Sequence, residues 1–396
     1  MQITVVGQGY VGLPLAIAAA ESGLLVFGLD SDKGRIQDLS KGVSPLSDIS
    51  SNVICKNLDS KNYKPTTDVS VIAESEIILI CVPTPITVAR TPDLSFLINA
   101  ISSVAKNLRK GSLIIIESTI EPGTCKNLLL PIILKESGLG ADDFDLAYSP
   151  ERIDPANLSW TIKNTPKLLA GLSSNAVERS YKFYNQFVDS IVICSSIEIA
   201  ETAKLLENSF RLINISFINE ISLFCQKLGI NVTEVIKAAA TKPYGFMPFY
   251  PSIGVGGHCI PVDPIYLAEK AKDLGVPIQL IETAAKVNNS MPDYFVKKSA
   301  EKLGSLMGKK ILVVGVAYKP NVSDVRESQA VSLILRLRDE GALVSWHDEI
   351  VKTWNGEKSV ALTNDYDLAI IATHHDYLRL EMLGGVMQLN TRGPIL

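Results

Sequence analysis

Several features that would define a function class are missing from this sequence of 396 residues. Its six cysteines form no C-x-x-C pair, and no cysteine or histidine cluster has the spacing of a zinc site. No apolar run is long enough to cross a bilayer, and the opening "MQITVVGQG" reads as a strand rather than as a basic, apolar leader. We therefore expect a cytoplasmic protein with reduced thiols, no metal and no membrane partner.

An excess of charge of one sign is also missing. Lys and Arg number 38 against 42 Asp and Glu, which leaves a net charge of −4. A nucleic-acid-binding face needs a strongly basic surface, so no nucleic-acid partner is expected. With 46% hydrophobic and 20% charged residues, the composition is typical of a globular protein, and the length predicts two or three domains.

The first half of the chain alternates strand-like and helix-like segments. Its short apolar runs are residues 2–7, 24–30, 75–85, 111–119 and 143–149. Continuous apolar strands separated by helices predict a parallel sheet covered on both faces. We expect a doubly wound α/β domain over residues 1–195.

A long helical pattern follows, from residue 197 to 228, and ends at Gly229. It is apolar on nearly every face, which predicts a buried helix between domains or at a subunit interface. From Lys309 the strand–helix alternation returns without the glycine fingerprint of the first domain. The predicted fold class is α/β, with two Rossmann-like doubly wound domains (1–195 and 301–396) joined by a long central helix and a helical middle domain (196–300).

A nucleotide fingerprint opens the chain. Gly7, Gly9 and Gly12 have G-x-G-x-x-G spacing between a strand and a helix, and Asp30 ends the next strand. These glycines permit the tight turn, the approach of a pyrophosphate and close helix packing. Asp30 would accept hydrogen bonds from ribose hydroxyls and repel a 2′-phosphate, which favours NAD over NADP. Arg35 either lies along the adenosine or is solvated.

Two later loops are expected at the carboxyl edge of the same sheet, where ligands bind in open α/β folds. They are "CVPTP" (81–85) and "ESTIEPGT" (117–124). Thr84 and Thr119 are candidate ligand contacts. Thr84 is equally consistent with a loop hydroxyl that bonds the backbone.

The segment "GVGGHCIPVDP" (254–264) frames Cys259 between a glycine pair and a proline. A packing cysteine needs no such frame, whereas a nucleophile that must meet a substrate closely does. Asp263 follows four residues later. His258 is next to the thiol in sequence, but adjacent side chains often point apart, so we expect a structural role for it.

A polar line runs through the apolar central helix. Lys204, Asn208 and Arg211 are spaced i, i+4 and i+7, on one helix face. Buried cations need partners, such as a substrate carboxylate, a phosphate or a developing oxyanion. The alternative is salt bridges to Glu201, Glu207 or a facing domain.

A carboxylate stands between prolines in "AYSPERIDP" (147–155). Glu151 there is a candidate general base on water. The alternative is an ordinary loop ion pair with Arg152.

Taken in order, these motifs resemble the UDP-glucose/GDP-mannose dehydrogenase family of nucleotide-sugar dehydrogenases. The resemblance runs nearly end to end and rests on "GQGYVGLPLA", "CVPTP", "STIEPGT", "SPER", "AETAKLLENSFRLINISFINE", "GVGGHCIPVDP" and "AYKPNVSDVRESQA". It implies oxidation of a sugar C6 alcohol to a carboxylate with two NAD per turnover. Cys259 would form a thiohemiacetal and then a thioester that water hydrolyses.

The resemblance also assigns further residues. The other catalytic positions are Lys204, Asn208, Asp263, Glu151 and Thr119. The cofactor positions are Gly7, Gly9, Tyr10, Val11, Gly12, Asp30, Arg35, Thr84, Thr119 and Arg326. The positions that would contact the UDP-sugar substrate are Glu151, Arg152, Lys204, Asn208, Arg211, Tyr250, Gly256 and Lys319. Solvated loop charge is the alternative for Lys319 and Arg326. A homodimer through the central helix is also implied.

One departure bears on the substrate. Relatives that act on UDP-glucose commonly have lysine before the motif aspartate, and this chain has Val262. The upstream stretch, Arg152 and Arg211 resemble the branch that acts on UDP-N-acetylhexosamines, notably UDP-N-acetylglucosamine. UDP-N-acetylmannosamine and UDP-glucose stay open as alternatives. So do a two-electron dehydrogenase that needs no cysteine and a non-catalytic module that binds NAD and nucleotide sugars.

Overall fold

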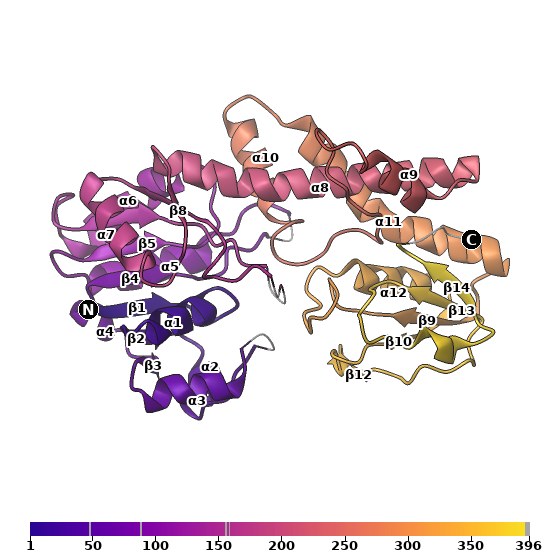
Figure 1. The fold of residues 1–396 in the computed structure, drawn as a ribbon, viewed down its shortest axis with the longest axis horizontal. Helices are drawn as coiled ribbons and strands as arrows, with labels where there is room; N and C mark the ends of the chain where they lie inside the picture. The colour runs from indigo at the N-terminus through magenta and orange to yellow at the C-terminus, as the bar shows by residue number, and fades with distance from the viewer. Residues whose placement is uncertain (47–48, 88, 155–156, 158, 393–396) are drawn as a thin grey trace. The chain divides into compact units, whose positions relative to one another are not determined.

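The computed structural model describes residues 1–46, 49–87, 89–154, 157 and 159–392. The chain folds into two compact units, Met1–Leu206 and Glu207–Leu396 (Figure 1). The finer division into three domains stays a prediction. No helix among the described residues is long and apolar enough to cross a membrane.

The first unit is built on one mixed sheet. Its strands lie in the order β3-β2-β1-β4-β5-β6-β7-β8. Their bounds are β1 Gln2–Val6, β2 Leu25–Leu29, β3 Tyr63–Thr66, β4 Ile77–Ile80, β5 Leu113–Ile116, β6 Asp145–Tyr148, β7 Lys167–Gly171 and β8 Ile191–Ile193. Neighbours are parallel except β6 and β7, which pair antiparallel. The sequence had predicted a parallel sheet throughout, so this last part of the sheet differs.

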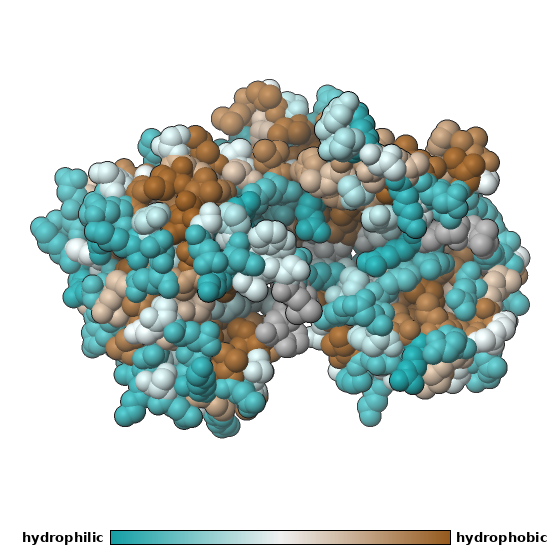
Figure 2. Space-filling model, in the orientation of Figure 1, coloured by the Kyte–Doolittle hydropathy of each residue, from teal (hydrophilic) through white to brown (hydrophobic). Residues whose placement is uncertain are grey.

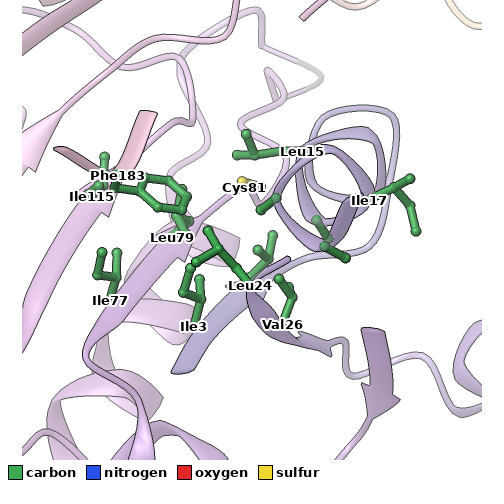
Figure 3. Close-up of a cluster of buried hydrophobic side chains, with 14 of the residues drawn as sticks. Ile3, Leu15, Ile17, Leu24, Val26, Ile77, Leu79, Cys81, Ile115 and Phe183 are labelled. Atoms are coloured by element: carbon green, nitrogen blue, oxygen red, sulfur yellow. The ribbon is translucent and has the colours of Figure 1, made fainter. Parts of the chain in front are cut away.

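Strand β4 shows why both faces of this sheet are covered. Ile77 and Leu79 point to one face, where they pack with Phe183 and helix α1 (Figure 3). Ile78 and Ile80 point to the other face. All four strand residues are at most 3% exposed. Strands that are apolar on both sides need helices above and below, as the doubly wound α/β prediction requires.

Helices supply that cover. In the first unit they are α1 Gly12–Glu21, α2 Lys33–Ser40, α3 Ser51–Asp59, α4 Val71–Glu74, α5 Ser95–Lys106, α6 Leu130–Ser137 and α7 Ser174–Tyr184, with a π-helical turn, Cys125–Leu129, before α6. Helix α1 starts at the fingerprint glycine and is followed by Gly23, whose φ is +92°. A left-handed glycine just past the last turn is a common way for a helix to end.

The second unit holds a smaller parallel sheet in the order β10-β9-β13-β14. Its strands are β9 Lys310–Val314, β10 Leu343–His347, β13 Leu368–Ile371 and β14 Met387–Asn390, with a hairpin of β11 Thr353–Trp354 and β12 Glu357–Lys358. Its helices are α9 Val232–Ala239, α10 Asp263–Asp273, α11 Gln279–Leu303 and α12 Gln329–Asp339, with a 3₁₀ turn at Leu380–Leu383. The second Rossmann-like sheet predicted after residue 301 is present.

Helix α8, Ile197–Leu228, has the predicted bounds and runs across the boundary between the two units. On a single chain the helix is exposed along part of its length, so its expected burial between domains or at a subunit interface stays a prediction there. Leu206, Phe217 and Phe224 are 60%, 57% and 59% exposed. Its apolar residues point in all directions, but only part of its circumference contacts this chain's own core. Figure 2 shows hydrophobic residues at the surface where α8 ends.

Candidate active site

The glycine fingerprint forms the turn between β1 and α1. Gly7 has a φ of +92°, and a Cβ there would lie 2.7 Å from the carbonyl oxygen of Cys81. A Cβ on Gly12 would lie 1.8 Å from the carbonyl oxygen of Gly7. At Gly9, by contrast, no heavy atom of the described residues lies within 4 Å of that position. The turn is therefore closed on two sides by packing and open at Gly9. Tyr10 and Val11, in the same turn, are half-buried.

Asp30 stands just past the end of β2, beside this turn, and is 8% exposed. Its Oδ2 accepts the backbone N–H of Gln8 at 2.7 Å, and its Oδ1 accepts that of Asp32 at 2.9 Å. Arg35, expected along the adenosine or in solvent, forms an ion pair with Asp30 at 3.0 Å. Backbone donors thus fix the carboxylate at the place where dinucleotide-binding folds meet the adenosine ribose.

Sequence reasoning missed the role of Gln8. Its side chain is fully buried, donates to the carbonyl of Val5 at 2.8 Å and accepts from the hydroxyl of Tyr63 at 2.8 Å. A side chain on Gly28 would collide with it, since a Cβ there would lie 2.6 Å from its Oε1. The two hydrogen bonds of the Gln8 side chain thus fix the turn to β1 and to Tyr63 of β3. The fingerprint spacing gives no signal for it, because that position of the motif is variable.

The loops after β4 and β5 lie side by side, as predicted. The hydroxyl of Ser118 donates to the carbonyl of Val82 at 2.7 Å and ties one loop to the other. Thr84 and Thr119 are half-buried in these loops. Their contacts to ligands stay predictions.

Two of the predicted catalytic charges meet in the first unit. Lys204 is 5% exposed and Glu151 is 9% exposed, with 4.0 Å between Nζ and Oε2. The guanidinium of Arg152 donates to the carbonyl of Pro166 at 2.5 Å. An ammonium this deeply buried needs an anion nearby, and a carboxylate at this distance provides one.

Glu201, considered above as a lysine partner, has another task. It is fully buried, and its carboxylate accepts the backbone N–H groups of Gly123 at 2.5 Å and Cys125 at 3.1 Å. Burial raises the pKa of Glu201, against the two N–H groups that lower it. The contact ties the start of α8 to the loop that carries Thr119.

A second buried network, also missed, lies beneath Glu151. Lys167 pairs with Glu117 at 2.7 Å, and the hydroxyl of Tyr184 donates to the same carboxylate. Burial raises the pKa of Tyr184. The backbone carbonyl of Glu117 accepts the N–H of Glu151 at 3.3 Å. The signal in the sequence was a glutamate directly after the apolar strand β5, at a position that is 1% exposed.

The second unit brings together Asn208, Asp263 and the loop 254–259, which we call the cysteine loop. Asn208 Nδ2 donates to Asp263 Oδ2 at 2.5 Å, and Asp263 is 3% exposed. Asp263 is the first residue of α10, and its N–H donates to the carbonyl of Cys259 at 2.8 Å. Cys259 is an exposed cysteine, outside any disulfide, in the loop before that helix. The backbone of Cys259 is thus bonded to the residue that carries the fixed carboxylate.

The glycines before the thiol have a packing reason that the sequence did not reveal. A Cβ on Gly256 would lie 2.5 Å from the carbonyl oxygen of Glu327. Gly257 has a φ of +88°, and a Cβ there would lie 2.7 Å from the ring of Tyr318. The Gly257 N–H also donates to the carbonyl of Arg326 at 3.1 Å. The loop therefore lies directly on the segment that follows β9.

The remaining predicted residues are placed as follows. Arg326 is exposed and its Nε donates to both carboxylate oxygens of Asp324, at 2.8 and 2.9 Å. Lys319 is half-buried, while Arg211 and Tyr250 are exposed. Their predicted ligand contacts are not tested by these positions.

The structural role expected of His258 stays a prediction. The residue is half-buried, and its Nε2 has no hydrogen-bond partner among the described residues. Burial, together with the charge of Arg326, lowers the pKa of His258. Both effects disfavour the charged form of the ring.

The first unit has the structure of a dinucleotide-binding domain: a doubly wound sheet, a glycine turn after its first strand and a fixed acidic residue past the second. The protein therefore belongs to the class of NAD-dependent dehydrogenases. The chain belongs to the UDP-glucose/GDP-mannose dehydrogenase family. The family's NAD binding domain matches residues 1–188, its central domain residues 198–290 and its UDP binding domain residues 312–394. The protein is therefore an NAD-dependent oxidoreductase whose substrate is a UDP-sugar.

Similar proteins carry different substrate names. UDP-N-acetyl-D-glucosamine 6-dehydrogenase of Pseudomonas aeruginosa is 32% identical over 388 residues, 95% of this chain and 90% of its own. UDP-N-acetyl-D-mannosamine dehydrogenase of Pyrococcus horikoshii is 34% identical over 382 residues, with 95% and 90% covered. A solved UDP-D-ManNAc dehydrogenase from Pyrococcus horikoshii superposes with a TM-score of 0.91 at 32% identity, covering 99% of this chain and 95% of that one.

Proposed function

We propose that the protein oxidises the C6 hydroxyl of a UDP-N-acetylhexosamine, with UDP-N-acetylglucosamine the favoured substrate, to the uronic acid for surface polysaccharide precursors. The observation that carries the proposal is the exposed Cys259, whose backbone carbonyl accepts the N–H of Asp263 at 2.8 Å. The carboxylate of that aspartate in turn accepts a hydrogen bond from Asn208 at 2.5 Å. A simple alcohol dehydrogenase has no use for such a thiol. A four-electron oxidation needs one to hold the carbonyl carbon between its two oxidations.

The chemistry balances in three steps. The C6 alcohol loses a hydride and a proton and becomes an aldehyde. The Cys259 sulfur then bonds to C6, and loss of a second hydride and proton leaves a thioester. Water attacks the thioester carbonyl, the C–S bond breaks, and the thiol and a carboxylate are released. NAD supplies the hydride acceptor, one molecule for each of the two oxidations.

The side chains divide these tasks. Glu151, 9% exposed and 4.0 Å from Lys204, is the base that takes the proton of the attacking water. Lys204 and Asn208, four residues apart on α8, hold the reacting oxygens. Asp263 orients Asn208, and Thr119 completes the water site. A buried ammonium stabilises each oxyanion that forms on C6.

We assign binding roles on the same basis. Gly7, Gly9, Tyr10, Val11, Gly12, Asp30, Arg35, Thr84, Thr119 and Arg326 bind NAD. Arg152, Arg211, Tyr250, Gly256 and Lys319 bind the UDP-sugar. A cytoplasmic location agrees with the cysteines of the described residues, which form no disulfide among themselves.

The identity of the sugar is the finer part of the proposal. Val262 replaces the lysine common in UDP-glucose enzymes, and relatives named for UDP-N-acetylglucosamine and for UDP-N-acetylmannosamine are equally similar. UDP-N-acetylmannosamine is the first alternative and UDP-glucose the second. A non-catalytic binding module is disfavoured, because every expected catalytic residue type is present.

A homodimer through α8 is the state that we propose for the enzyme. Leu206, Phe217 and Phe224 would leave a large apolar area in water on a single chain. Light scattering on the native protein measures its mass. Twice the chain mass of 43.0 kDa supports the proposal, and a persistent monomer contradicts it.

The test of function counts NADH formed per sugar consumed, across UDP-N-acetylglucosamine, UDP-N-acetylmannosamine, UDP-glucose and GDP-mannose. Two NADH per UDP-N-acetylglucosamine supports the proposal, and two per UDP-glucose keeps the mechanism and corrects the substrate. One NADH per sugar excludes a thioester mechanism, and no NADH from any sugar favours a binding module.

The Cys259→Ser variant should yield no free acid and should retain a bound adduct, which mass spectrometry detects. The Cys55→Ser variant, at another exposed cysteine, should turn over normally.

A further inference from the structure

Helix α11 carries a polar residue in its buried stripe. The apolar members of the stripe are Ile281, Ala284, Met291 and Phe295. Asn288 falls in the same stripe and is 1% exposed. A buried amide is costly unless its oxygen and nitrogen both find partners, so this side chain has a specific task.

Its partner is the backbone of the cysteine loop. Asn288 Oδ1 accepts the N–H of Val255 at 2.6 Å, and Nδ2 donates to the carbonyl of Val255 at 3.1 Å. The side chain thus bonds both backbone groups of one residue, as a neighbouring strand would. A slip of the loop by one residue would break both bonds at once. Val255 lies four residues before Cys259.

The helix backbone adds a second contact at the same place. Pro292, inside α11, has no N–H to give the carbonyl of Asn288 its usual helical hydrogen bond. Gly254 lies against that carbonyl: a Cβ there would be 2.8 Å from the carbonyl oxygen and 3.2 Å from Oδ1 of Asn288. Gly254 also has a φ of +112°, which L side chains rarely adopt. Consecutive loop residues, Gly254 and Val255, are therefore held against Asn288.

We propose that Asn288 is a positioning residue that sets the backbone of the loop 254–259, and through it the sulfur of Cys259, for attack on the C6 aldehyde. The inference rests on the proposed function, since it needs Cys259 as nucleophile. Asn288 does not touch the reacting atoms. It acts through Val255 on where the thiol stands when the aldehyde forms.

The two oxidations depend on this position unequally. Reduction of the C6 aldehyde by NADH, the reverse of the first step, uses no thiol. Oxidation of the same aldehyde by NAD requires the C–S bond. A displacement of about 1 Å in a reacting group lowers a rate by about 100-fold, so only the second half-reaction should suffer.

The experiment measures both half-reactions, with the aldehyde of the sugar that the wild type oxidises, in Asn288→Asp. Aspartate keeps the acceptor for the Val255 N–H and loses the donor to its carbonyl. Aldehyde oxidation should fall about 10- to 100-fold, and aldehyde reduction should change by no more than about twofold. Asn289→Asp makes the same change one residue along the helix and should alter neither rate.

Gly254→Ala tests the same contact from the loop side, if the aspartate variant unfolds. It should give the same split between the half-reactions. Equal losses in both half-reactions, or no loss in either, would overturn the positioning role. The failure of the proposed function looks different: a wild type that produces one NADH per sugar has no thioester step to position.

Discussion

Two turns, one in each unit, begin alike. Gly7 follows β1 and Gly315 follows β9, with φ angles of +92° and +80°. Each donates its N–H at 2.8 Å to the last residue of the neighbouring strand, Leu29 in one case and His347 in the other. Both halves of the protein therefore start their nucleotide-fold motif with the same left-handed glycine.

The likeness extends to an aspartate just past the second strand. Asp30 accepts the N–H of Gln8 at 2.7 Å, and Asp348 accepts the N–H of Val316 at 3.0 Å. In each turn the donor is the residue after the glycine. In both turns the aspartate therefore has a structural role, because it accepts a backbone N–H of the turn.

The turns then diverge. Asp30 also accepts the N–H of Asp32 and pairs with Arg35, whose side chain is 36% exposed. Asp348 instead takes a hydrogen bond at 3.0 Å from His375 and another from the amide of Val351, and the side chains of Asp348 and His375 are fully buried. We call the turn at Gly7 with Asp30 the open corner, because it is left accessible to a ligand. We call the turn at Gly315 with Asp348 the closed corner, because its aspartate is buried and its hydrogen bonds hold the domain together. The same local motif can therefore serve binding or stability.

The largest effect should follow from adding a methyl group to the closed corner. In Gly315→Ala the Cβ would lie 2.2 Å from the carbonyl oxygen of Thr373, against 2.7 Å to that of Cys81 for Gly7→Ala. With the left-handed φ added, we expect about 4 kcal/mol of destabilisation for Gly315→Ala and about 3 for Gly7→Ala. Urea unfolding followed by far-UV circular dichroism measures both.

A matched control separates the collision from the backbone angle. Gly385 has a φ of +83°, and no heavy atom of the described residues lies within 4 Å of its Cβ position. Gly385→Ala should lower the free energy of unfolding by only about 1 kcal/mol. If Gly315→Ala costs no more than this control, the corner of the second unit is not closed as described.

The next effect is on acid stability. Burial alone would raise the pKa of Asp348, but hydrogen bonds from His375 and from the amides of Val351 and Val316 outweigh it and bring the pKa to about 2. An aspartate in an unfolded chain has a pKa of about 4, so Asp348 stabilises the fold above pH ~4. That contribution, about 2 kcal/mol, is lost as the pH falls from about 4 to about 2.

Asp348→Asn should therefore destabilise the second unit by at least about 2 kcal/mol at pH 7 and by much less near pH 2. The fluorescence of Trp346, which is 1% exposed and belongs to this unit, reports its unfolding. Asp339→Asn, at an exposed aspartate ending α12, is the control. A destabilisation that stays constant from pH 7 to pH 3 would remove the ionic role.

A substitution at the open corner should mainly change the preference for NAD over NADP rather than the stability. Asp30→Asn leaves an oxygen for the Gln8 N–H but removes the negative charge that repels a 2′-phosphate. The ratio of kcat/KM for NAD over NADP should fall about 10-fold, with a smaller loss of stability than in Asp348→Asn. An unchanged ratio would count against the cofactor role of Asp30.

The comparison also shows how far the sequence reached. Hydrophobic runs predicted β1, β2 and β4–β6 within a few residues, because these strands are short, apolar and largely buried. The helical pattern likewise predicted the bounds of α8. Strand β8, Ile191–Ile193, escaped because it is short and its Val192 and Ile193 are 47% and 56% exposed. Strand β3 contains Pro65, which an edge strand tolerates and a pattern search rejects.

For the site, spacing and resemblance named Cys259, Lys204, Glu151 and the other residues to which we assign catalytic roles. They did not name Gln8 or Asn288, whose partners are backbone atoms distant in sequence or inside the same turn. A motif records which side chains act, whereas backbone hydrogen bonds leave no residue type to read. Asn288 did leave one trace, since a polar residue in an apolar helix stripe signals a buried partner.

The smallest effect should come from the ion pair that distinguishes the open corner. Arg35 pairs with Asp30 at 3.0 Å, but it is partly exposed, and pairs of this kind contribute about 0–1 kcal/mol. Arg35→Gln should therefore leave the unfolding transition nearly unchanged and alter KM for NAD by about twofold. His375→Gln, at the matching position on Asp348, should destabilise its unit several times more, because that hydrogen bond is fully buried. A loss of NAD binding above about 10-fold in Arg35→Gln, more than an exposed ion pair can supply, would show that this guanidinium contacts the adenosine itself.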